Sequence, residues 1–240
     1  MGASSFAPTM TGTSDHSIVL TEAYAFIAFK NTVNNQGLVA RFDGTTWEAQ
    51  AFFTNNPKAI DLACHGGKPF VSFVNNEAMD MVSVRTTMTA GWPPTVWDFL
   101  YDDGAPYFTG AYREDSAIVF SGDIPYVASM ITGTISVDRY GSSNLWEAAG
   151  ANPVTSNGFK FKLAVGPDGS VHIAYRDGDS ANTITVKKLV GSTWETVGQA
   201  GFSGAVGDSL DLAISPVDGK PYVAYVNADD SNKVQVMVFE

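Results

Sequence analysis

The stretch PYVAYVNADDSNKVQVMVFE (221–240) shows the pattern on which the fold prediction depends. Two segments with an apolar residue at every second position flank a polar loop rich in Asp and Asn. SVHIAYRDGDSANTITVKKL (170–189) has the same three parts in the same order. Alternation with a period of two is typical of β-strands that bury one face. Each stretch therefore predicts a pair of strands joined by a hairpin loop.

Related pairs of strands occur earlier in the chain. They are IPYVASMITGTISVDRY (124–140), KPFVSFVNNEAMDMVSVR (68–85) and YAFIAFKNTVNNQGLVARF (24–42). When the five stretches are aligned, their first strands start at Phe26, Phe70, Tyr126, His172 and Tyr222. A unit thus recurs roughly every 50 residues, which indicates an internal repeat.

Each repeat contains further predicted strands in addition to this pair. Alternating segments precede the pairs at SIVLT (17–21), AIDLAC (59–64), SAIVFS (116–121), FKLAVG (161–166) and SLDLAIS (209–215). A Trp followed by an acid comes after the first four pairs, at Trp47, Trp97, Trp146 and Trp194. Four-stranded units that recur every 40–50 residues are typical of β-propellers. The sequence predicts an all-β, five-bladed β-propeller with four antiparallel strands per blade.

The fifth repeat reaches Glu240 before its Trp strand is due, and SFAPTMTG (5–12) occupies the register of such a strand. We therefore expect a single domain over 1–240 in which the N-terminal strand near Phe6 completes the last blade and closes the ring. The expected blades cover about 13–57, 58–114, 115–158, 159–207, and 208–240 plus 1–12.

The repeat resembles the propeller units of bacterial lectins, and its five-fold count is similar to that of the tachylectin-like lectin propellers. FDGTTW (42–47) also resembles the Asp box of sialidases, but Gly44 directly follows Asp43, which departs from that motif. The resemblance covers essentially the whole chain at the level of the fold. It implies a lectin-like, carbohydrate-binding propeller and leaves the ligand unspecified.

Charge and composition exclude several classes of partner. Lys and Arg number 14 against 25 Asp and Glu, so the formal net charge is -11. An acidic chain does not suit nucleic acid or an anionic membrane surface, because both require basic residues. No stretch approaches the roughly 18 apolar residues of a membrane helix. The compartment and the oligomeric state stay open, with a secreted, cell-surface or virion-associated protein favoured.

The sequence predicts no metal site and no cofactor. The single cysteine, Cys64, excludes an intramolecular disulfide and a cysteine-rich metal site. His16, His65 and His172 fall at different positions of three repeats, so they are not expected to meet. The acidic loops lack the Asp-x-Asp-x-Asp-Gly arrangement of a calcium loop.

The loops between the second and third strands are the predicted ligand face. They are dense in carboxylates, amides and hydroxyls, which can pair with the hydroxyls of sugars. The candidate residues are Asn75, Asn76, Asp177, Asp179, Asp229 and Asp230. The long insertion of the second repeat (86–115) adds Trp92, Tyr101, Tyr107 and Tyr112 as an aromatic platform, although some of these rings must pack against their own blade.

These patterns leave three functions open. The leading hypothesis is a non-enzymatic binding module that recognises glycans on the loop face, with no catalytic residue. The alternative is a polysaccharide hydrolase or lyase that uses Asp61 and Asp211, which align in the innermost strand with Lys162 at the same position of the fourth repeat. The third is a protein-interaction scaffold. The expected partner is therefore a carbohydrate or a protein ligand.

Overall fold

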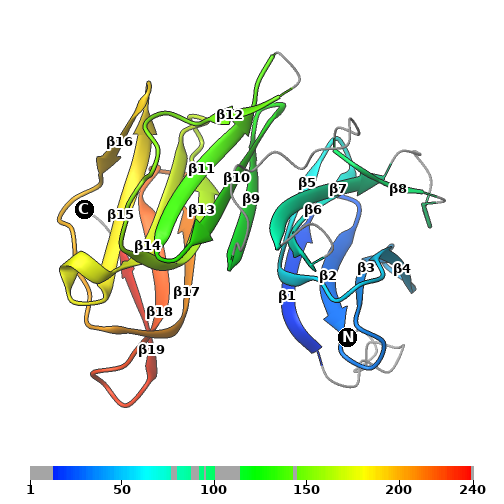
Figure 1. Cartoon of the computed structure of the whole chain (residues 1–240), viewed down its shortest axis with the longest axis horizontal. Coiled ribbons are helices and arrows are strands. Elements are labelled where there is room, and N and C mark those ends of the chain that lie inside the picture. Colours follow the sequence, from blue (N-terminus) through cyan, green and yellow to red (C-terminus); the bar gives the residue numbers. More distant parts are fainter. Residues whose placement is uncertain are drawn as a thin grey trace. The chain divides into compact units, whose positions relative to one another are not determined.

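A computed structural model places the described residues in five antiparallel sheets (Figure 1). The described residues are 13–76, 80–87, 92–94, 96–100, 114–142 and 145–238. The chain divides into two compact units, Met1–Ile118 and Val119–Glu240.

Two sheets lie in the first unit, and each follows the chain in a simple meander, β1-β2-β3-β4 and β5-β6-β7-β8. The strands of the first sheet are β1 (Thr13–Leu20), β2 (Ala25–Asn31), β3 (Gln36–Phe42) and β4 (Trp47–Phe53). Those of the second are β5 (Lys58–His65), β6 (Lys68–Asn75), β7 (Met81–Thr87) and β8 (Trp97–Phe99).

The other three sheets have the same meander order. The third consists of β9 (Asp115–Ser121), β10 (Ile124–Ile131), β11 (Thr134–Tyr140) and β12 (Trp146–Ala148). The fourth consists of β13 (Gly158–Val165), β14 (Val171–Asp177), β15 (Thr183–Val190) and β16 (Thr193–Thr196). The fifth consists of β17 (Val206–Ile214), β18 (Pro221–Asn227) and β19 (Lys233–Val238).

This architecture confirms the prediction of an all-β, five-bladed propeller. Four blades have four antiparallel strands, and the fifth has three among the described residues. The fourth strand expected for that blade falls in residues 1–12, which lie outside the described residues. Closure by the N-terminal strand, the single domain and the blade boundaries therefore stay predictions.

The repeated aromatic residues pack at the start of each fourth strand. Trp97 and Trp194 are buried. Trp47 stacks on Phe42 with 5.0 Å between ring centroids. These contacts explain why the repeat keeps a large ring at this position.

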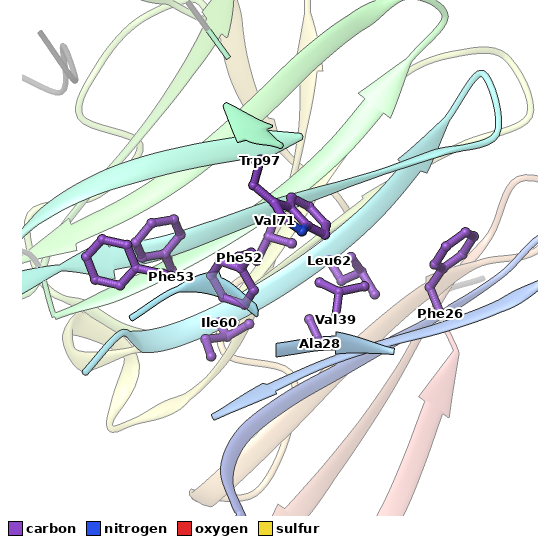
Figure 2. Packing of buried hydrophobic residues seen from close by; sticks show 10 residues of the cluster. Phe26, Ala28, Val39, Phe52, Phe53, Ile60, Leu62, Val71 and Trp97 are labelled. Atoms are coloured by element: carbon purple, nitrogen blue, oxygen red, sulfur yellow. The ribbon is translucent and has the colours of Figure 1, made fainter. Parts of the chain in front are cut away.

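The core of the first unit lies between its two sheets. Figure 2 shows Ala28 and Val39 from the first blade facing Ile60, Leu62 and Val71 from the second. All five side chains are buried, and burial of such apolar surface is the main favourable contribution to folding. Among the described residues, no helix is both long and apolar enough to span a bilayer.

Candidate functional site

A cavity of about 430 Å³ lies on one face of the fourth blade, within the second unit. One wall is the segment 153–156, which connects the third blade to the fourth. The opposite wall comes from β14, the turn after it, β15 and the end of β16. The lining residues are Pro153, Val154, Thr155, Ser156, Tyr175, Asp177, Asp179, Thr185, Lys187, Thr196 and Ala200.

The strand register explains why these side chains share a face. Tyr175 of β14 is directly opposite Thr185 of β15, and Lys187 is opposite both Ile173 of β14 and Thr196 of β16. Because side chains alternate between the two faces of a strand, residues two apart on each strand point the same way. Tyr175, Asp177, Thr185 and Lys187 therefore form one continuous polar stripe under the segment 153–156.

Asp177 holds the turn at the end of β14. Its Oδ2 accepts hydrogen bonds from Thr185 Oγ1 at 2.7 Å and Ser180 Oγ at 3.3 Å, and its Oδ1 accepts from the backbone N–H of Asp179 at 3.0 Å. The side chain is 6% exposed. A carboxylate with this many donors is an anchoring group, and the short 3-10 turn Gly178–Ser180 begins directly after it.

Lys187 supplies the ammonium group of the cavity. Its Nζ donates to the carbonyl oxygen of Val154 at 2.7 Å, so it ties β15 to the opposite wall. Nζ also lies 6.0 Å from the centroid of the Tyr175 ring. Partial burial lowers the pKa of Lys187, and the nearby Asp177 carboxylate opposes that shift. An ammonium has three donors, so Nζ can bind further acceptors.

Asp179 and Tyr175 mark the outer and inner ends of the cavity. Asp179 is exposed, and its Oδ1 accepts from Asn157 Nδ2 at 2.8 Å. Tyr175 is 2% exposed, and burial, together with the Asp177 charge, raises the pKa of its phenol well above the usual range. Tyr175 therefore stays a neutral hydroxyl at physiological pH.

Three of the four remaining loop candidates make polar side-chain contacts within the fold. Asn75 is buried and its Nδ2 donates to Ser83 Oγ at 3.3 Å, while Asn76 Oδ1 is buried with no partner among the described residues. In the fifth blade, Asp229 Oδ2 accepts from the N–H of Ala205 at 2.8 Å, and Asp230 pairs with Lys233 at 2.8 Å. Of the six loop candidates, the cavity brings together Asp177 and Asp179 alone, and ligand contact by any of them stays a prediction.

Trp92, the first residue of the predicted aromatic platform, lies against the core of the first unit. It meets Phe26 edge to face at 5.7 Å and Trp97 at 6.5 Å, and the Arg41 guanidinium lies 5.3 Å from its ring centroid. Its side chain is half-buried. Tyr101, Tyr107 and Tyr112 lie outside the described residues. A role of these four rings in ligand binding stays a prediction.

The proposed channel carboxylates differ in environment. Asp61 accepts from Ser17 Oγ at 2.8 Å through Oδ1 and from the N–H of Ile118 at 2.9 Å through Oδ2. Both carboxylate oxygens of Asp61 therefore accept hydrogen bonds within the first unit. Asp211 is exposed and accepts from the N–H of the adjacent Leu212 at 2.9 Å. Within the described residues there is no group of three or more His, Cys, Asp or Glu that could hold a metal ion.

The sequence prediction did not include Val154, Thr155, Thr185 or Lys187. The sequence signal that could have identified the cavity is the small residue at position 154, at an inter-blade position equivalent to Phe202. Val154 N–H donates to Ile135 O at 2.9 Å just as Phe202 N–H donates to Ile184 O at 3.2 Å. Val154 thus occupies the position that Phe202 fills one blade later, and alignment of the inter-blade segments shows this smaller residue.

No family model and no curated protein sequence matches the chain. Solved structures do match its fold. AofleA from Arthrobotrys oligospora has a TM-score of 0.66 at 11% identity, over 94% of this chain and 68% of that one. The Aleuria aurantia lectin AAL, in complex with Fucalpha1-6GlcNAc, has a TM-score of 0.65 at 16% identity, over 97% and 77%. The chain therefore shares the propeller fold of these two proteins.

Glycoside hydrolases are also among the neighbours. An α-L-arabinofuranosidase from Podospora anserina, in complex with cellotriose, has a TM-score of 0.53 at 11% identity, over 95% of this chain and 89% of that one. At such low identities the likeness concerns the fold alone. The neighbours therefore include both carbohydrate-binding and carbohydrate-processing proteins.

Proposed function

We propose that this protein is a non-enzymatic carbohydrate-binding module whose ligand occupies the cavity of the fourth blade. The lining is the observation that supports this most directly. It combines a carboxylate at Asp179, an ammonium at Lys187 and the hydroxyl of Thr155 with apolar surface from Pro153 and Val154. Sugar hydroxyls both donate and accept, so a sugar site needs both kinds of partner. The volume of about 430 Å³ is in the range of small-ligand sites.

The carboxylates of the cavity favour binding over hydrolysis. Glycoside hydrolysis by the usual mechanism needs two carboxyl groups that are both free to act on the glycosidic bond. Asp177 is held by Thr185, Ser180 and the Asp179 N–H, which leaves Asp179 as the one accessible carboxylate among the lining residues. Asp61, from the alternative hydrolase proposal, is likewise engaged through both oxygens.

A glycan array with matched variants tests the proposal. The informative variant is Lys187→Met, because it removes the ammonium and introduces the residue that stands at the same position, Met237, in the fifth blade. Loss of a hydrogen bond from a charged donor should weaken binding roughly 10- to 100-fold. The control is Asp218→Ala, which removes an exposed carboxylate in the turn between β17 and β18 of the fifth blade and should leave binding unchanged.

A turnover assay on the glycans that bind separates the alternatives. Binding without cleavage, lost in Lys187→Met and kept in Asp218→Ala, supports the proposal. Cleavage products from the wild-type protein would point to the hydrolase or lyase instead. Equal binding by both variants would place the ligand elsewhere, and an array with no bound glycan would favour the protein-interaction scaffold.

A further inference from the structure

The charges around the cavity are unequal. Two carboxylates, Asp177 and Asp179, face one ammonium, Lys187. The Lys187 ammonium is already bonded to the Val154 carbonyl, and partial burial makes its charged form less favourable. The protein as a whole has a formal net charge of -11. A negative surface around a concave site raises the local concentration of cations and lowers that of anions.

The two carboxylates differ in how available they are to a ligand. Both oxygens of Asp177 accept hydrogen bonds from its own blade, and the side chain is buried. Asp179 is exposed at the outer end of the cavity, and only its Oδ1 is engaged, by Asn157 Nδ2 at 2.8 Å. Within the described part of the chain, Asp179 Oδ2 has no hydrogen-bond partner. This oxygen is a charged acceptor beside the cavity.

Resting on the carbohydrate-binding function proposed above, we infer that the cavity selects sugars by charge: it prefers amino sugars with a free ammonium group, accepts neutral sugars less tightly and disfavours sugars that carry a carboxylate. The ammonium of an amino sugar would donate to Asp179 Oδ2 at the outer end. The sugar hydroxyls would then meet Lys187 Nζ and Thr155 farther in.

The expected preference is modest and depends on salt. A hydrogen bond between two charged groups is stronger than one from a neutral hydroxyl by about 1 kcal/mol, which corresponds to a roughly five-fold difference in Kd. Because Asp179 is exposed, mobile ions screen this attraction. The preference should shrink as NaCl rises from about 0.02 M to about 0.5 M, where the Debye length falls to a few ångströms.

Matched glycosides test the inference on the full chain. The probes are the methyl glycosides of glucosamine, glucose and glucuronic acid, together with the corresponding galactose series, so that within a series one substituent sets the charge. Kd values are measured by NMR titration at about pH 6, where an alkyl amine is protonated. The variant is Asp179→Asn, which keeps an oxygen acceptor for Asn157 and removes the charge. The control is Asp218→Asn, an exposed carboxylate in the turn between β17 and β18 of the fifth blade.

The outcomes separate this inference from the function on which it rests. Tighter binding of the amino sugar, lost in Asp179→Asn while binding of the neutral sugar persists, supports the inference. Equal affinity for the charged and neutral members, or a preference for the uronide, overturns it and leaves carbohydrate binding intact. An unchanged amino-sugar preference in Asp179→Asn also overturns it. No binding by any of the six probes, together with an array that binds no glycan, would overturn both proposals.

Discussion

The fourth and fifth blades have nearly the same second strand, but different side chains face that strand. Tyr175 and Asp177 end β14, and Tyr225 and Asn227 end β18 at the same positions. In both blades the final residue accepts from the N–H two residues on, at 3.0 Å for Asp177 and 2.9 Å for Asn227. The second strand therefore builds the same turn in both blades, and the difference between the blades lies in the side chains that face it.

The difference comes from two facing positions. In the fifth blade, Phe202 and Met237 pack into the cluster that contains Tyr225. In the fourth blade the same positions hold Val154 and Lys187, which line the cavity. The polar ends differ as well, because Tyr225 Oη donates to Gln235 Oε1 at 2.8 Å, which places an amide where the fourth blade has Thr185.

The second blade has a phenylalanine at the inter-blade position, as the fifth blade does, and a cation on the facing strand, as the fourth blade does. Arg85 of the second blade stands at the position of Lys187, and its Nη1 donates to the carbonyl oxygen of Phe52 at 2.8 Å. Phe52 is 1% exposed and lies against Trp97 and Ile60 (Figure 2). The bond from cation to carbonyl is thus shared between the two blades, whereas Val154 takes the place of a phenylalanine. In the fourth blade the smaller Val154 side chain and the Lys187 cation both line the cavity.

We expect the largest change in stability from deleting the segment that is predicted to supply the fourth strand of the fifth blade. The fifth blade shows three strands among the described residues, where the fourth shows four. If residues 1–12 complete it, their deletion leaves the backbone edge of β19 unpaired, and should lower the melting temperature by about 10 °C, equivalent to a few kcal/mol. An unchanged melting temperature of the truncated protein, measured by calorimetry, would contradict the closure.

Shortening Phe202, which packs against the fifth blade, should lower the stability of the protein by a smaller amount. Phe202→Val removes part of a half-buried ring from the cluster around Tyr225, and such large-to-small changes leave a cavity. We expect the free energy of unfolding to fall by about 1–2 kcal/mol in urea titrations. A loss below about 0.3 kcal/mol would show that Phe202 does not fill this face.

Combining Phe202→Val with Met237→Lys would reproduce both cavity positions of the fourth blade. We expect the number of bound ligands per chain to rise by one in titration calorimetry. An unchanged stoichiometry would show that the fifth blade also needs the equivalents of Asp177 and Thr185 to form a site.

Filling the cavity of the fourth blade should weaken ligand binding strongly and change the stability of the protein little. Val154→Phe places a ring in a space of about 430 Å³, so the melting temperature should move by no more than a few degrees. Binding should fall at least ten-fold, because the ring occupies the volume of the ligand. Val197→Phe offers a size-matched control, since Val197 packs in the cluster between the fourth and fifth blades and is not in the cavity lining. Undiminished binding by Val154→Phe would exclude this cavity as the site.

The sequence was sufficient for the fold because alternation and repetition are local. The hairpin of 221–240 and its four relatives specify strands, turns and blade number without knowledge of any long-range contact. The cavity depends on the volume left between Val154 and Lys187, which are 33 residues apart, and no local pattern reports that volume. Asp177 and Asp179 could be predicted as candidates because they are acidic residues in a loop. Acidic residues also stabilise turns, however, and Asp177 Oδ1 does so by accepting from the Asp179 N–H.

The smallest expected effect concerns a pH-dependent difference between the same two blades. His172 in β14 is 2% exposed, whereas the aligned Tyr222 in β18 is 41% exposed. Burial lowers the pKa of His172 below 6.5, Lys188 adds to that shift, and the Ser170 carbonyl and Asp168 oppose it. As the pH falls through about 6.5, the unfolded chain takes up this proton and the folded protein does not.

The free energy of unfolding of the wild-type protein should therefore decrease below about pH 6.5, until the folded protein also protonates His172. His172→Phe, which places there the residue found at the aligned Phe70, removes this contribution and should flatten the dependence between about pH 7 and pH 5. Urea titrations across that range measure the difference, with the exposed His16→Gln as a control. A dependence in His172→Phe as steep as that of the wild type would show that groups other than His172 account for the loss of stability over this pH range.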